Sequence, residues 1–144
     1  MQNSQHSISL LFSSPTFEHE LLPQLNEMFT VHAESNVNSL ETYLKEQSLF
    51  SLPDVIVLEV DQDLRCFDFV KMLKSNALLK GLVIVLLSST KKEEIRQLAM
   101  QHKVNDLYVS PIPLADLCER IVFLVKFKLI KPQLADLSQI DYTY

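Results

Sequence analysis

The chain has 144 residues, of which 47% are hydrophobic and 22% are charged. These values are typical of one globular domain whose core needs no disulfide or metal to hold it together. The formal net charge is −5, without the basic excess that a nucleic-acid-binding surface brings, so nucleic acid is not an expected partner.

The cysteines and the apolar runs indicate the cellular compartment of the protein. Cys66 and Cys118 fit neither a disulfide framework nor a CxxC motif, which indicates reduced thiols in a cytoplasmic protein. The N-terminal residues lack the charged region and the apolar length of a signal peptide. No apolar run approaches the roughly 20 residues that a spanning helix needs, so we expect no membrane segment in this chain. The single glycine, Gly81, excludes the glycine-rich loops that hold nucleotide phosphates.

Five short apolar runs are spaced along the chain as strands. The three strongest, ISLLF, VIVLEV and LVIVLL, are nearly continuous in branched apolar residues, as strands buried on both faces are. The two weaker runs are FTVHA and DLYV. In chain order, the five predicted strands are 8–12, 29–33, 55–60, 82–87 and 106–109.

Helical patterns lie between and after these strands. In the first helix, Pro23 is expected to kink or shorten the helix. Capping boxes are predicted at Asn38 with Glu41, after the second strand, and at Thr90 with Glu93, after the fourth. The last helix follows the fifth strand and has an apolar stripe at helical spacing. The residues of this stripe are Leu114, Leu117, Cys118, Ile121, Leu124 and Val125.

The order strand then helix, repeated five times, predicts a doubly wound α/β domain. Such a domain has a five-stranded parallel sheet, right-handed crossovers and helices on both faces. Its functional side chains gather where the strands end. We expect residues 1–128 to form this domain and residues 129–144 to be a C-terminal tail or a linker to a fused output domain.

Residues 8–128 resemble the receiver domain of bacterial response regulators, which is flavodoxin-like. The resemblance rests on PDVIVLE, VIVLLSS and VNDLYVSP, which match the family's third, fourth and fifth strands in order and spacing. The family works in two-component signal transduction and phosphorelay, where an aspartate accepts a phosphoryl group with the help of Mg²⁺ and a lysine. The resemblance implies a signalling module with protein partners, and a cis bond between Ser110 and Pro111.

Most of the family's phosphotransfer residues are replaced in this chain. Glu59 stands for the phosphoacceptor aspartate, and neutral serines stand for the acidic pair and the lysine. Hydroxyl groups do not compensate the charge of Mg²⁺, so we expect no metal and no cofactor in this pocket. The residues of this degenerate pocket are Ser13, Ser14, Ser88, Ser110 and Pro111, of which Ser88 and Pro111 are compatible with the family pattern.

Two interpretations of Glu59 stay open at this stage. A carboxylate hydrogen-bonded to Ser88 would imitate a permanently switched-on receiver, whereas a solvated polar loop at a strand end has no such role. Asp61 and Asp63 are alternative acceptors or metal ligands, although loop carboxylates are usually only solvated. The sequence therefore predicts a non-catalytic pseudo-receiver that is not phosphorylated. The alternative is a divergent receiver that still accepts a phosphoryl group on Asp61.

An enzyme is the least expected class. No G-x-S-x-G elbow is present, and no histidine falls at the end of a predicted strand, where a catalytic base would have to lie. His102 lies on the apolar face of its helix and is expected at the edge of the core. The other three histidines, expected at the surface, are His6, His19 and His32.

The last helix carries more apolar surface than one buried stripe explains. The additional residues on this helix are Val122, Phe123, Phe127 and Leu129. With Tyr108 of the fifth strand and the neighbouring fourth helix, they predict a face for a protein partner, a fused output domain or a homodimer. The alternative is that Leu134 and Leu137 of the tail cover these residues.

Overall fold

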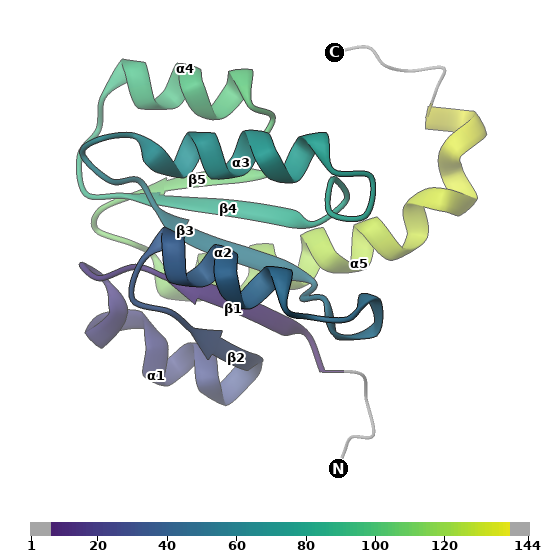
Figure 1. Cartoon of the computed structure of the whole chain (residues 1–144), viewed down its shortest axis with the longest axis horizontal. Helices are drawn as coiled ribbons and strands as arrows, with labels where there is room; N and C mark the ends of the chain where they lie inside the picture. The colour runs from purple at the N-terminus through teal and green to yellow at the C-terminus, as the bar shows by residue number, and fades with distance from the viewer. Residues whose placement is uncertain (1–6, 139–144) are drawn as a thin grey trace.

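The computed structural model describes residues 7–138, with side chains through Lys128. Five parallel strands form one sheet in the order β2-β1-β3-β4-β5 (Figure 1). The strands are β1 (Ser9–Ser13), β2 (Thr30–Ala33), β3 (Val55–Glu59), β4 (Val83–Ser88) and β5 (Asp106–Val109). The helices are α1 (Glu18–Met28), α2 (Val37–Lys45), the 3₁₀ turn η1 (Leu49–Ser51), α3 (Arg65–Ser75), α4 (Glu93–Gln101) and α5 (Leu114–Ser138). The predicted doubly wound fold is confirmed.

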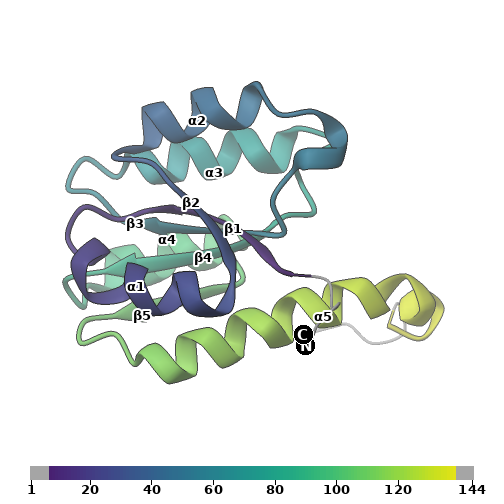
Figure 2. The same ribbon diagram turned by 90° about the horizontal axis from the view of Figure 1, so that it is seen from below.

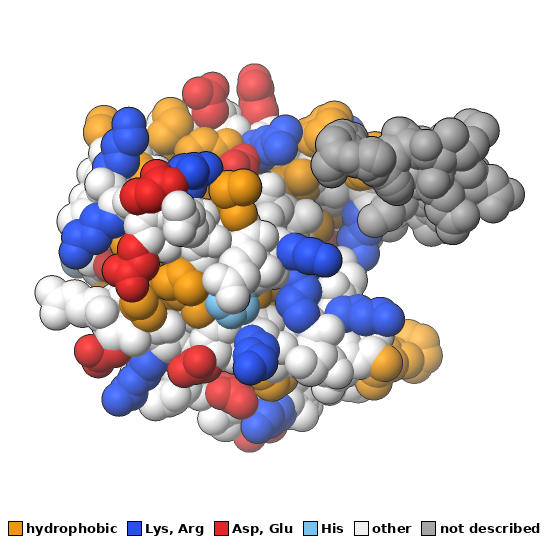
Figure 3. Space-filling view, turned by 90° about the horizontal axis from the view of Figure 1, so that it is seen from above, with side chains coloured by type: hydrophobic (Ala, Val, Ile, Leu, Met, Phe, Trp, Pro, Cys, Tyr) orange, Lys and Arg blue, Asp and Glu red, His pale blue; other side chains and the backbone are white. Residues whose placement is uncertain are grey.

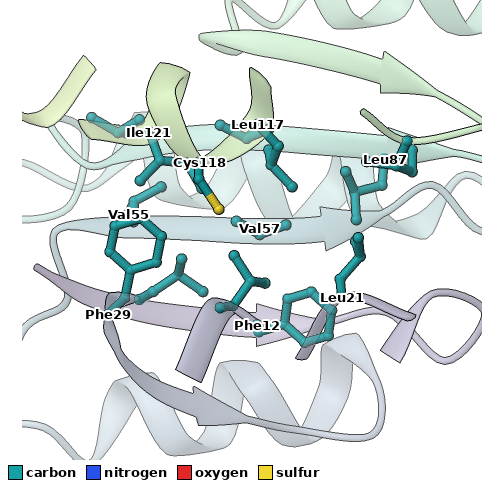
Figure 4. Packing of buried hydrophobic residues seen from close by; sticks show 14 of the residues in the cluster. Phe12, Leu21, Phe29, Val55, Val57, Leu87, Leu117, Cys118 and Ile121 are labelled. Carbon is teal, nitrogen blue, oxygen red and sulfur yellow. The ribbon is translucent and has the colours of Figure 1, made fainter. Parts of the chain in front are cut away.

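Helices cover both faces of the sheet, as the continuous apolar strands require. Helices α1 and α5 pack on one face, and α2, α3 and α4 pack on the other (Figure 2). Successive strand residues point to opposite faces, so Val55 and Val57 of β3 face α5 while Ile56 and Leu58 face α3. Figure 4 shows the hydrophobic core on the face covered by α1 and α5, with the Cys118 sulfur directed at the sheet.

The predicted capping box of α2 is wrong by two residues. Asn36, not Asn38, is the N-cap, and its side chain accepts a hydrogen bond from the backbone amide of Ser39. The Ser39 side chain returns to the backbone amide of Asn36 and completes the box. Asn36 is in the extended conformation that an N-cap needs, so the helix begins at once after it.

The predicted capping box of α4 is also wrong. The N-cap is Lys92, and no side chain caps this helix. Thr90 is held instead in a local turn with Ser88, whose hydroxyl donates to the Thr90 carbonyl at 2.6 Å and accepts from the Thr90 amide at 3.2 Å. A residue engaged in a side-chain turn of this kind is not free to start a helix.

Helix α1 runs through Pro23 from Glu18 to Met28, eleven residues. Leu21 and Leu25, on either side of the proline, are both buried. An interior proline removes one helical hydrogen bond, and these buried apolar contacts offset the loss.

Helix α5 confirms its predicted core stripe and is longer than expected. Leu117, Cys118, Ile121 and Val125 are buried, while Leu114 and Leu124 pack partly buried against the same cluster. The helix continues to Ser138, beyond residue 128, where the tail is predicted to begin. Figure 2 shows this extension passing the amino ends of the strands. The division between a domain and a tail stays a prediction.

Within residues 7–138, two residues other than glycine adopt a left-handed backbone conformation. Leu64, just before α3, has φ 60°, and Lys103, just after α4, has φ 59°. Gly81, the only glycine of the chain, does not have a positive φ. The chain therefore places ordinary side chains where glycine is the less strained choice.

Candidate functional site at the carboxyl end of the sheet

Three predicted site residues meet where β1, β3 and β4 end. Ser13 pairs in register with Leu58, and Glu59 pairs with Leu87, so Glu59 lies between the ends of β1 and β4. Among residues 7–128, the buried polar side chains are Ser13, Ser14 and Ser88. The sheet thus places Ser13, Ser14 and Ser88 at the strand ends next to Glu59, whereas the predicted Ser110 is exposed.

The Glu59 carboxylate is bound by the loop between β1 and α1. Its Oε1 atom accepts hydrogen bonds from the Ser14 hydroxyl at 2.9 Å and from the Thr16 backbone amide at 2.8 Å. Its Oε2 atom accepts a further bond from the Thr16 hydroxyl. The Ser14 oxygen also accepts from the backbone amide of Phe17, just before α1. Both carboxylate oxygens are therefore engaged within the protein.

Of the two interpretations left open for Glu59, the one with a hydrogen bond to Ser88 does not agree with the structure. The Ser88 hydroxyl is committed to its turn with Thr90, and Glu59 is committed to Ser14 and Thr16. Thr16 was not expected at the site, because no sequence motif links it to a residue 43 positions away. The Glu59 side chain reaches Ser14 and Thr16 in the loop that follows β1, and β1 lies on the side of β3 opposite to β4.

The loop after β3 separates its two aspartates. Asp61 accepts hydrogen bonds from the backbone amides of Arg65 and Cys66 at 3.1 and 3.0 Å, so it caps the start of α3. Asp63 is exposed. Both aspartates line a hollow of about 210 Å³ together with Glu59 and Ser13.

A neighbouring hollow contains a lysine that was not predicted at the site. Its volume is about 170 Å³, and Asp61, Ser88 and Lys92 line it between the β3–α3 and β4–α4 loops. The position matched to the family's lysine is Ser110, which is exposed. Its bond to Pro111 is cis, as the resemblance implies. Lys92 thus approaches the site from α4, where no motif marks it.

The residues at this end do not fit a magnesium site of the family type. Ser13 and Ser14 bring no charge, and the oxygens of Glu59 and Asp61 accept hydrogen bonds from the protein. Magnesium prefers near-octahedral oxygen ligands that include free carboxylates. In the described part of the chain, no three His, Cys, Asp or Glu side chains come together as possible metal ligands.

The predicted partner face lies on α4, β5 and α5. Phe123 is 54% exposed and Phe127 is 46% exposed, and their rings stack with centroids 6.0 Å apart. Val122 and Tyr108 are partly buried against the core. Leu129, Leu134 and Leu137 lie outside the residues whose side chains are described.

Next to this face, a groove of about 590 Å³ runs between α4 and β5. Its apolar lining includes Ile95, Ala99, Leu107 and Val109. Strand β5 is at the edge of the sheet, so one side of its backbone faces this groove. The Arg120 guanidinium binds Asp106 of β5 at 3.0 Å and lies 5.5 Å from the Phe123 ring centroid, linking the strand to the exposed aromatics.

The three histidines of the described residues lie where the sequence places them. His102 is half-buried, with its ring 5.3 Å from the Phe67 ring, at the edge of the core. His19 and His32 are exposed, and His32 stacks on Tyr43. His6 lies outside the described residues.

The similarity to known proteins is one of structure. No protein-family model and no curated protein matches the chain. Among solved structures, a signal receiver domain of a histidine kinase from Syntrophus aciditrophicus has a TM-score of 0.71 at 18% identity, over 83% of this chain and 91% of that chain. A CheY-like receiver domain protein from Methanospirillum hungatei has a TM-score of 0.73 at 11% identity, over 88% and 99%.

A third similar structure is the chemotaxis response regulator CheY4 of Vibrio cholerae, with a TM-score of 0.67 at 17% identity over 81% of this chain and 99% of that chain. At these identities the comparisons concern the fold. The five-stranded parallel sheet and the five helices of this chain agree with the fold of these structures. The chain therefore has the fold of response regulator receiver domains.

Proposed function

We propose that this chain is a pseudo-receiver, a non-catalytic signalling module that works through protein–protein interaction without being phosphorylated. Its place of action is the cytoplasm, where the buried free thiols Cys66 and Cys118 stay reduced. The module passes on or assembles a signal by binding, and it needs no cofactor.

The observation that carries this proposal is the bonding of Glu59. Both oxygens of this carboxylate accept hydrogen bonds from Ser14 and Thr16. An acceptor of a phosphoryl group needs a free oxygen directed at the donor and positive charge to stabilise the transition state. Glu59 has three donors already, and the serines beside it bring no charge.

Binding takes place, in this proposal, on the face formed by Tyr108, Val122, Phe123 and Phe127. Two exposed, stacked phenylalanines beside an apolar groove are the type of anchor that dominates protein interfaces. A second copy of the chain is the partner we favour, and a fused output domain would use the same residues.

Phosphorylation is tested by incubating the protein with acetyl phosphate and Mg²⁺ and measuring its intact mass. We expect no stable gain of a phosphoryl group in the wild type or in Glu59→Gln. A gain in the wild type that Asp61→Asn abolishes would contradict the proposal and establish the divergent receiver. Asp63→Asn tests the second loop aspartate in the same way, and a gain that this substitution abolishes would equally contradict the proposal.

A further inference from the structure

The amino end of the sheet, opposite the candidate site, concentrates positive charge in an acidic protein. Lys71, Lys74, Lys80 and Lys103 line one open hollow of about 600 Å³, and no Asp or Glu lines it. Figure 3 shows a group of Lys and Arg side chains on this side of the molecule, next to a histidine. A net charge of −5 does not lead one to expect such a concentration.

Helix ends account for only part of this lysine cluster, defined as Lys71, Lys74, Lys80 and Lys103. Lysines in the last turn of a helix are stabilised by its dipole, which suits Lys74 of α3. Lys80 lies in the loop between α3 and β4, where no helix dipole favours it. Lys128 approaches the same loop from α5, with its Cε atom 3.8 Å from the place where a Cβ on Gly81 would lie.

The same end carries apolar side chains at the tips of two neighbouring loops. Phe50 and Leu49 of η1 are 97% and 58% exposed, and Leu78 of the α3–β4 loop is 65% exposed. The two loops lead into adjacent strands, and the Val83 amide donates to the Asp54 carbonyl at 3.3 Å where those strands begin. Figure 1 shows both loops on one side of the molecule.

We propose that this end of the molecule docks on an anionic phospholipid surface. Phe50, Leu49 and Leu78 enter the interfacial layer, and the lysine cluster lies against the headgroup phosphates. Protruding apolar tips among lysines are the features that hold proteins on anionic membranes. A peptide partner would instead need an apolar groove, and these tips project from the surface.

The choice of lysine supports a lipid partner over a single bound phosphate or an acidic protein. A fixed phosphate or carboxylate is best held by the planar, bidentate guanidinium of arginine. The hollow is lined by four lysines and no arginine, and ammonium groups act as point charges toward a fluid array of headgroups. The interaction would also orient the domain, because the carboxyl end of the sheet, with Glu59, Asp61 and Asp63, would face away from the membrane.

Vesicle sedimentation tests the proposal with the full 144-residue chain. We expect binding to phosphatidylcholine vesicles that contain phosphatidylserine, weakening with salt, and none to phosphatidylcholine alone. Lys71→Glu with Lys80→Glu should reduce the affinity by at least about fivefold per lysine. Lys91→Glu with Lys92→Glu, two exposed lysines at the opposite end, changes the net charge equally and should alter the affinity by less than about twofold.

Phe50→Ser tests the apolar contribution without a change of charge, and it should weaken vesicle binding several-fold. The substituted side chains are exposed, so each variant should keep its fold. Thermal unfolding of each variant checks this. No binding to the anionic vesicles, or equal losses in the two lysine pairs, would overturn the proposal. The protein could also bind a polyglutamate peptide or inorganic phosphate as tightly as it binds the vesicles, with no effect of Phe50→Ser. That result would also overturn the proposal, because it would assign the lysine cluster to another anion.

Discussion

Thr16 binds the Glu59 carboxylate twice, through its backbone amide at 2.8 Å and through its hydroxyl. The two residues are 43 positions apart, so this pair closes the loop between β1 and α1 onto the end of β3. A glutamate at this position thus acts as a structural clamp. An aspartate, one methylene shorter, would not reach Thr16 from the same backbone position.

The Ser14 hydroxyl is expected to contribute to stability through this clamp. Ser14 is buried and links the Glu59 carboxylate to the Phe17 amide, so Ser14→Ala should lower the free energy of unfolding by about 1–2 kcal/mol. Urea denaturation measures the change. Ser13→Ala is the matched control, because Ser13 is equally buried but has no side-chain hydrogen bond among the described residues. Equal losses in the two variants would show that the clamp contributes nothing.

Asp61 is expected to stabilise α3 rather than to accept phosphate. Asp61→Ala removes the acceptor of two backbone amides at the start of α3 and should cost about 1–2 kcal/mol of unfolding free energy. Asp63→Ala, in the same loop but exposed, should stay within about 0.5 kcal/mol of the wild type. Equal shifts of the denaturation midpoint in Asp61→Ala and Asp63→Ala would contradict the role of Asp61 as the cap of α3.

The exposed phenylalanines of α5 are expected to hold two copies together. At high micromolar concentration the wild type should have a mass above that of the monomer, and Phe123→Glu with Phe127→Glu should be a monomer, because two charges cannot be buried at an apolar contact. Light scattering after gel filtration gives the mass. Phe50→Glu, on an even more exposed phenylalanine at the other end, should leave the mass unchanged. A monomeric wild type would contradict the homodimer.

Cys66 is expected to resist alkylation and to make the protein sensitive to alkali. Burial, with a smaller effect from the nearby Asp61 charge, raises the pKa of the Cys66 thiol from 9.0 to about 12. A raised pKa means that the folded state holds its proton more tightly. The stability that results is fully present below about pH 9 and is lost as the pH rises toward 12.

Two measurements check this prediction for Cys66. Iodoacetamide at pH 9 should modify the native protein much more slowly than the denatured protein. Between pH 9 and 12 the free energy of unfolding should fall less in Cys66→Ala than in the wild type. Rapid alkylation of native protein, located at Cys66 by peptide mass, would contradict the assignment.

The sequence was most informative where one physical signal dominates. Strands buried on both faces appear as continuous apolar runs, and all five were predicted to within about two residues of their observed ends. The α2 cap was misplaced because SNVNS offers several suitable residues, and only the backbone conformation distinguishes Asn36 from Asn38. Local motifs identify a helix start only approximately.

Contacts between distant residues left no such signal. The hydrogen-bond partners of Glu59 could not be predicted, because several hydroxyl and amide groups lie near the strand ends. Only the conformation of the loop between β1 and α1 decides which of them the carboxylate meets. The lysine cluster spans residues 71 to 103, so it forms no basic run in the sequence and becomes visible only when α3, the following loop and the end of α4 are assembled. Side-chain placement within a known fold therefore required the structure.

The left-handed backbone at Lys103 has a consequence for protein engineering. A residue with a Cβ atom in this conformation costs roughly 1–2 kcal/mol that glycine avoids, although glycine loses more entropy on folding. Lys103→Gly, at an exposed position, should therefore raise the melting temperature or leave it unchanged while removing one charge of the hollow. If lipid binding falls in the same variant, the residue at position 103 has opposite effects on thermostability and on membrane affinity.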